Sequence, residues 1–154
     1  MNRYEQARDY VYGEFSKIYN VQLKTLAYTH TNSVDACITL LAISRGLNVE
    51  LAKISALFHD FAQFTDNCPH AQHAKLSSLH ANQFLKSTEA FKVHEIDDIC
   101  FAISQHSKKK QYDSPLCEAL KDADVLANFL NNPDSDEFTG IKKERLLNAC
   151  ADLK

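Results

Sequence analysis

The scarcity of glycine and proline constrains this chain most, because its 154 residues include only three of each. An all-β sandwich or barrel of many short strands needs turn residues at every reversal, so this composition disfavours that class of fold. Apolar residues recur instead at steps of three and four, as at Val34, Ile38 and Leu41, which is the period of an amphipathic helix. The sequence therefore predicts an all-α protein, and its length suits a single domain over residues 1–154.

Periodicity and capping residues predict about seven helices. The first spans about 4–19 and the second about 29–45, with Gly46 in the usual place just past a helix end. Asn48 caps a third helix that ends at or just after the pair His59 and Asp60. Further helices are expected over 73–86, 91–107, 116–130 and around 141–149, joined by loops at 66–72, 107–114 and 131–136.

Charge and hydropathy exclude several classes of partner. Seventeen Lys and Arg against 20 Asp and Glu give a net charge of −3, so no binding of nucleic acid polymer or anionic lipid is expected. No window approaches the roughly 18 uninterrupted apolar residues of a membrane span, and residues 1–20 are too charged for a signal peptide. Five scattered cysteines without C-x-x-C spacing indicate reduced thiols. A cytoplasmic protein is expected, and its oligomeric state stays open.

Seven histidines are the unusual feature of the composition, because imidazole is the side chain most used for metal ligation and proton transfer. His59 and Asp60 close an apolar run, where a charged pair is costly to bury unless coordination or hydrogen bonds compensate. His30 lies at the inward-facing start of the second predicted helix, and Asp124 flanks the apolar face of the helix over 116–130. Two imidazoles and two carboxylates suit a divalent ion of Mn, Fe, Ni, Co, Mg or Zn in a site with open positions.

The order His30, His59-Asp60, Asp124 resembles the H, HD, D signature of the HD-domain superfamily of metal-dependent phosphohydrolases, whose members are all-helical. Five local sequences resemble family motifs in family order, namely H-T-N-S-V from His30, A-L-F-H-D-F-A-Q-F around His59, H-A-K-L-S-S from His73, I-S-Q-H-S around His106 and D-A-D-V-L around Asp124. The resemblance covers about residues 29–130. It implies that His30, His59, Asp60 and Asp124 ligate a divalent metal ion.

The resemblance also implies a second set of site residues. In family members with two metals, a histidine that opens the helix after the HD pair and another that ends the following helix join the site. His73 and His106 match these places, and His106 also shares the apolar face of its predicted helix with Ile103. His80, seven residues after His73, is the rival for the first place. One or two ions per chain are implied, with His73 and His106 either ligating the second ion or acting as catalytic residues beside Asp60.

The activity implied by the resemblance is hydrolysis of a phosphoester of a nucleotide or another small phosphorylated metabolite by a metal-activated water. Lys108, in the lysine run after His106, is a candidate for binding the substrate phosphate. Alarmone hydrolases and bacterial 5′-deoxynucleotidases of the family carry an acidic residue shortly after the HD pair, where this chain has Gln63 and Phe64, with Asp66 as the nearest carboxylate. The chain is more similar to small stand-alone HD hydrolases that read H-D-I-G-R-F, and its general acid is not identified.

Two alternatives stay open on the same residues. The mixed-valent di-iron oxygenases share the fold and the six-ligand pattern, which implies oxidation of a small molecule instead of hydrolysis. A non-catalytic module that keeps the metal for stability or senses a small ligand is the other alternative. Metal content separates them, because about two irons per chain favour the oxygenase, whereas other ions lost on His59→Ala substitution favour the hydrolase.

Overall fold

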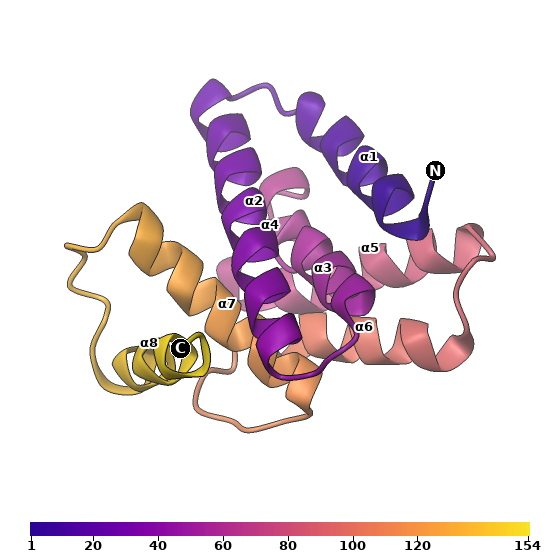
Figure 1. Cartoon of the computed structure of the whole chain (residues 1–154). Helices are drawn as coiled ribbons and strands as arrows, with labels where there is room; N and C mark the ends of the chain where they lie inside the picture. Colours follow the sequence, from indigo (N-terminus) through magenta and orange to yellow (C-terminus); the bar gives the residue numbers. More distant parts are fainter.

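The computed structural model describes residues 1–154 and contains helices but no strands (Figure 1). Seven helices have at least ten residues, and they are α1 (Arg3–Ser16), α2 (Val21–Ser44), α3 (Val49–Phe58), α5 (His73–Ser87), α6 (Val93–Gln105), α7 (Pro115–Asn131) and α8 (Gly140–Asp152). A five-residue helix, α4 (Phe61–Thr65), and a 3-10 turn at His70–Gln72 lie between α3 and α5. The predicted all-α class is confirmed, and so is the number of about seven helices.

Helix α2 begins at Val21, whereas the apolar stripe predicted a start near residue 29. The side-chain oxygen of Asn20 caps this helix by accepting a hydrogen bond from the Leu23 amide at 2.8 Å. The first turns face solvent, with Val21 69% exposed and Leu26 54% exposed, so no apolar stripe marks them in the sequence. The early start matters because Leu26, in these first turns, lines a cavity that is described below.

The connection from α2 to α3 follows the sequence prediction. Gly46 lies just past α2 with φ at +65°, a left-handed conformation that glycine adopts without the steric cost of a Cβ atom. Asn48 then caps α3 by accepting a hydrogen bond from the Leu51 amide at 3.1 Å. Because the turn is short, α2 and α3 pack against each other, and His30 comes close to the end of α3.

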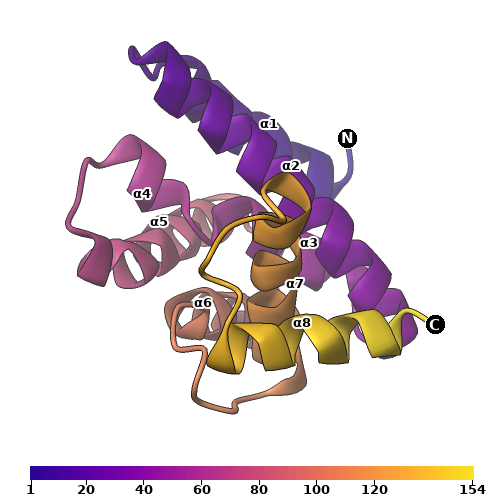
Figure 2. The same cartoon turned by 90° about the vertical axis from the view of Figure 1, so that its left-hand side faces the viewer.

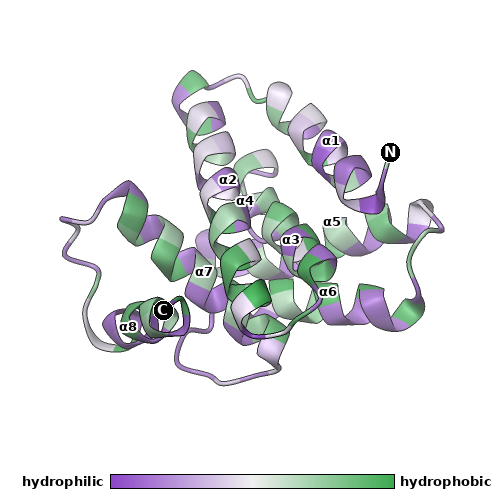
Figure 3. Ribbon diagram, in the orientation of Figure 1, coloured by the Kyte–Doolittle hydropathy of each residue, from purple (hydrophilic) through white to green (hydrophobic).

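A core of 32 buried apolar residues lies between the helices. Helix α2 packs along α7 and α3, while α5 packs against α6 and α4. Figures 1 and 2 show α2 crossing the molecule, with α7 and α8 on one side of it and α5 and α6 on another. Figure 3 shows that α3 is largely apolar, in agreement with its central place. None of the helices combines the length and apolar character that crossing a membrane requires.

Candidate metal centre

Six side chains with metal-binding chemistry converge at one end of the central helices. They are His30 on α2, His59 and Asp60 at the end of α3, His73 at the start of α5, His106 at the end of α6 and Asp124 on α7. The four histidines are buried, and Asp124 is 9% exposed. The structure thus brings together every residue that the sequence assigned to the first ion and to the possible second ion.

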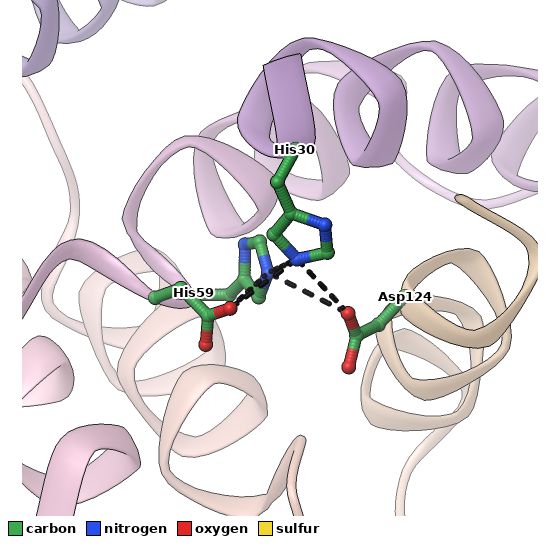
Figure 4. A group of neighbouring side chains, drawn as sticks. His30, His59 and Asp124 are labelled. Carbon is green, nitrogen blue, oxygen red and sulfur yellow. Dashed lines mark hydrogen bonds and ion pairs between the residues drawn. The ribbon is translucent and has the colours of Figure 1, made fainter. Parts of the chain in front are cut away.

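The first group consists of His30, His59, Asp60 and Asp124, whose ligand atoms all lie within 4.8 Å of one another. The Nε2 atom of His30 lies 3.0 Å from the Nε2 atom of His59. It also lies 3.2 Å from Oδ2 of Asp60 and 3.1 Å from Oδ1 of Asp124. Figure 4 shows the two imidazoles and the Asp124 carboxylate pointing toward one another. Three different helices therefore supply donors to a single point.

The second group consists of Asp60, His73 and His106. The Oδ1 atom of Asp60 lies 3.1 Å from Nε2 of His73 and 3.0 Å from Nε2 of His106, and these two nitrogens are 3.2 Å apart. Asp60 belongs to both groups, because its Oδ2 atom faces the first group and its Oδ1 atom faces the second. Asp60 could therefore contribute a ligand atom to each of two cations.

Backbone hydrogen bonds fix the protonation of three imidazoles. The Nδ1–H groups of His59 and His106 donate to carbonyls three residues earlier, those of Ala56 and Ile103, each at 2.7 Å. His73 donates in the same way to the carbonyl of His70. Because Nδ1 carries the hydrogen, Nε2 of each neutral ring is left with its lone pair, which is the tautomer that a metal ligand needs.

The donor set fits a divalent cation. Lone pairs on neighbouring Nε2 atoms repel unless a proton or a cation lies between them. Bonds from a zinc ion to imidazole nitrogen are about 2.0–2.1 Å long, so two imidazole nitrogens that bind one ion must lie close together. The Nε2 atoms of His30 and His59 are 3.0 Å apart and those of His73 and His106 are 3.2 Å apart, close enough for each pair to bind one ion. Imidazole and carboxylate together suit Mn, Fe, Co, Ni or Zn.

The electrostatics of these side chains also favour a positive charge at the site. Burial lowers the pKa of His30, but hydrogen bonds to Asp124 and Asp60 outweigh burial and raise it to about 10. Burial raises the pKa of Asp60, yet the imidazoles of His59 and His106 bring it well below its usual range. A proton on His30 thus occupies a place between two carboxylates that a metal ion also suits. By contrast, burial lowers the pKa of His106.

A cavity of about 420 Å³ opens over the two groups of candidate ligands. Its floor contains His30, Asp60, His73, His106 and Asp124. Its walls contain the apolar side chains of Leu26 and Phe64, the amides of Gln63 and Asn128, and the charged side chains of Lys109, Glu137 and Lys142. A small molecule fits this volume, which lies in the usual range of about 300–1,000 Å³ for ligand sites.

The lysine at the cavity is Lys109, one residue after the lysine that the sequence favoured. Lys108 is exposed and does not line the cavity. The Nζ atom of Lys109 donates to Oδ2 of Asp124 at 2.6 Å and to the carbonyl of His106 at 2.6 Å. The connection after α6 has no periodicity that would reveal which lysine faces inward, so the sequence offered no signal for this choice.

Three other polar residues in or near the motifs lie apart from the candidate ligands. Nε2 of His80 lies 2.6 Å from Oδ2 of Asp66, whereas Nε2 of His73 lies 3.1 Å from Oδ1 of Asp60, so the structure places His73 and not His80 beside the His-Asp pair. Asp66 is engaged by this contact and does not line the cavity. Asp122 accepts hydrogen bonds from Arg45 and Arg145 and orients no imidazole.

These features define a class: an all-helical protein that presents a His-Asp pair, together with further His and Asp side chains, at a site able to hold metal ions. The family model described as HD domain matches residues 27–128. The chain therefore belongs to the HD-domain family, and the resemblance inferred from its motifs is confirmed.

A solved structure supports the same fold. It is the crystal structure of a predicted HD superfamily hydrolase from an uncultured Thermotogales bacterium, with a TM-score of 0.66 and 18% sequence identity, covering 96% of this chain and 87% of that one. At this identity the similarity shows the fold alone. No curated protein matches the sequence significantly.

Proposed function

We propose that this protein is a metal-dependent phosphohydrolase that cleaves a phosphoester of a nucleotide or another small phosphorylated metabolite. The observation that carries the proposal is the Asp60 carboxylate, which joins two groups of imidazole and carboxylate donors at the floor of an open cavity. Of the two lysines that line the cavity, Lys142 pairs with Glu137 at 2.6 Å, so Lys109 is the positive side chain that favours an anionic substrate. The size of the cavity favours a small molecule over a nucleic acid polymer.

Each site residue has a place in this reaction. His30, His59, Asp60 and Asp124 would hold one divalent ion, and Asp60, His73 and His106 would hold a second. Such ions lower the pKa of bound water from about 15.7 to roughly 7 and stabilise the charge that develops on a phosphoryl group. The carbonyls that accept from the Nδ1–H groups of His59, His73 and His106 keep the Nε2 lone pairs aimed at the ions.

Two further features shape the reaction. Gln63 and Phe64 line the cavity shortly after the His-Asp pair, so neutral side chains stand beside the substrate there. The carboxylate of Asp66, the nearest acidic residue after the pair, contacts His80. The nearest charged donor to the Asp124 carboxylate is the Lys109 ammonium, which contacts Oδ2 of that carboxylate, while Oδ1 faces His30 and accepts a hydrogen bond from the Asn128 amide at 3.4 Å.

The test combines metal content with turnover. Protein purified without added metal or chelator is subjected to elemental analysis, then loaded with Mn²⁺ and assayed with an aryl phosphate and a panel of nucleotides. Asp60→Asn is compared with His94→Ala, which changes an exposed histidine outside the site. We expect hydrolysis by the wild type and the His94 variant, and a loss of at least about 100-fold for Asp60→Asn, because loss of even an outer-shell partner of a metal ligand costs 10–100-fold.

Other outcomes would select the alternatives. About two irons per chain, with oxygen consumption and no phosphate release, would replace the proposal with an oxygenase on the same fold. Bound metal without turnover of any substrate would indicate a metal-binding or ligand-binding module. A wild type that retains no metal after reconstitution would remove the basis of the proposal.

A further inference from the structure

Lys109 presents an unused hydrogen-bond donor to the cavity. Its ammonium group has three N–H donors, and two of them are engaged, by Oδ2 of Asp124 and by the carbonyl of His106. The third has no partner within the protein, although the side chain is only 12% exposed and lines the cavity over the metal ligands. A partly buried ammonium with one free donor, held beside a metal ligand, is suited to bind an anion.

The backbone that carries Lys109 is fixed by two buried cations from other helices. Arg145 of α8 donates from Nε to the Lys109 carbonyl at 2.8 Å and from its terminal nitrogen to the Gln111 carbonyl at 3.0 Å. Lys121 of α7 donates to the same Gln111 carbonyl at 2.8 Å. Lys121 is fully buried and Arg145 is 3% exposed. Acidic partners compensate both cations, through Asp113 and Glu118 for Lys121 and through Glu118 and Asp122 for Arg145.

This anchoring distinguishes Lys109 from its neighbours. A surface lysine loses considerable side-chain entropy when it binds a ligand, whereas Lys109 is already held by two short hydrogen bonds on a fixed backbone. Lys108 and Lys110 carry the same charge on the same connection, but both are exposed and neither lines this cavity. Of the three lysines, only Lys109 is held in place by the protein, which indicates that it has a specific function at the site.

We propose that Lys109 is a substrate-binding residue whose free N–H donates to a phosphoryl oxygen of the substrate. The inference rests on the proposed function, because the anion it assigns to Lys109 is the phosphoryl group of a phosphoester. It also gives α8, which lies beyond the residues matched by the family model, a role at the site: Arg145 positions the connection that carries Lys109.

The experiment measures binding of inorganic phosphate to the Mn²⁺-loaded full chain by titration calorimetry, with the Mn content of each protein determined in parallel. Lys109→Gln removes the donor, Lys109→Arg restores a cationic donor, and Lys108→Gln and Lys110→Gln are matched controls for loss of one positive charge. We expect Lys109→Gln to weaken phosphate binding by about tenfold or more at unchanged Mn content, since hydrogen bonds to charged groups are among the stronger ones. Lys109→Arg should recover part of the affinity, and the two controls should change it by less than about twofold.

Three results would overturn the inference: equal phosphate affinity in the Lys109→Gln and Lys108→Gln proteins, a parallel loss of Mn in Lys109→Gln, or no phosphate binding by the metal-loaded wild type. Different results would contradict the proposed hydrolase activity. A wild type that binds phosphate through Lys109 but hydrolyses no phosphoester would contradict the hydrolase and leave the anion site in place. A wild type that hydrolyses phosphoesters, and whose affinity for phosphate does not change on Lys109→Gln substitution, would support the hydrolase and contradict the role of Lys109.

Discussion

The Oδ1 atom of Asp60 lies 3.0 Å from the Nε2 atom of His106, although the two residues are 46 positions apart in the chain. The other carboxylate oxygen, Oδ2, faces His30 at 3.2 Å. Asp60 therefore links the candidate ligands on α2, α3 and α7 to those on α5 and α6. A site built in this way predicts different consequences for the loss of a ligand from each group.

Replacing His106 by alanine should remove one ion and leave the other. Elemental analysis of Mn²⁺-reconstituted protein should give about two ions per chain for the wild type, about one for His106→Ala and close to none for Asp60→Asn, because only Asp60 serves both groups. His80→Ala is the matched control, since His80 contacts Asp66 instead of a ligand. A wild type with one ion that His106→Ala does not alter would show that the second group holds no metal.

Metal removal should lower the melting temperature. An ion that binds only the folded protein stabilises it by about 2.7 kcal/mol at a free concentration 100 times Kd. One kcal/mol shifts Tm by about 2–4 °C in a chain of this size, so chelation should lower Tm by roughly 5–11 °C. Scanning calorimetry with and without chelator measures the shift.

The matching control for that experiment is His59→Ala, in which a fully buried ligand is lost. Its Tm should respond less to chelator than that of the wild type, because only the ion at Asp60, His73 and His106 would be left, whereas His94→Ala should respond as the wild type does. An equal response of His59→Ala and wild type would place the stabilising ion elsewhere.

The candidate ligands could be recognised in the sequence because each lies at a place that helical periodicity defines. His59 and Asp60 follow the apolar run of α3, His73 opens α5, and His106 shares the buried face of α6 with Ile103. Local patterning fixes these positions, and packing of the helices then brings them together. The family resemblance supplied the order that identifies them as one site.

Other features could not be predicted because no apolar periodicity marks them. The early start of α2 depends on the cap at Asn20 and not on an apolar stripe. The choice of Lys109 over Lys108 depends on the turn after α6, where the Lys109 amide donates to the carbonyl of Ser107 at 3.0 Å. The pairing of Asp122 with Arg145 joins α7 to α8 across 23 residues, and no local pattern encodes it.

The buried charges between α7 and α8 lead to a prediction on stability. The guanidinium of Arg145 is 3% exposed and pairs with Asp122 and Glu118, each at 2.8 Å. Arg145→Met removes the cation and leaves these carboxylates without it, and breaking a buried ion pair in this way costs about 3–5 kcal/mol. Urea unfolding of metal-free protein, followed by circular dichroism, should show a loss of this size in the free energy of unfolding.

Two further variants give this prediction its controls. Arg8→Met removes an arginine of α1 whose side chain is 38% exposed and whose partner Asp9 is 55% exposed, so its cost should stay within about 0.5 kcal/mol. Arg145→Lys keeps the charge but cannot reach both carboxylates and both carbonyls with one ammonium, so it should fall between wild type and Arg145→Met. If Arg145→Met unfolds at the same urea concentration as Arg8→Met, the ion pairs between α7 and α8 contribute nothing to stability, and the anchoring of the Lys109 connection must come from other contacts.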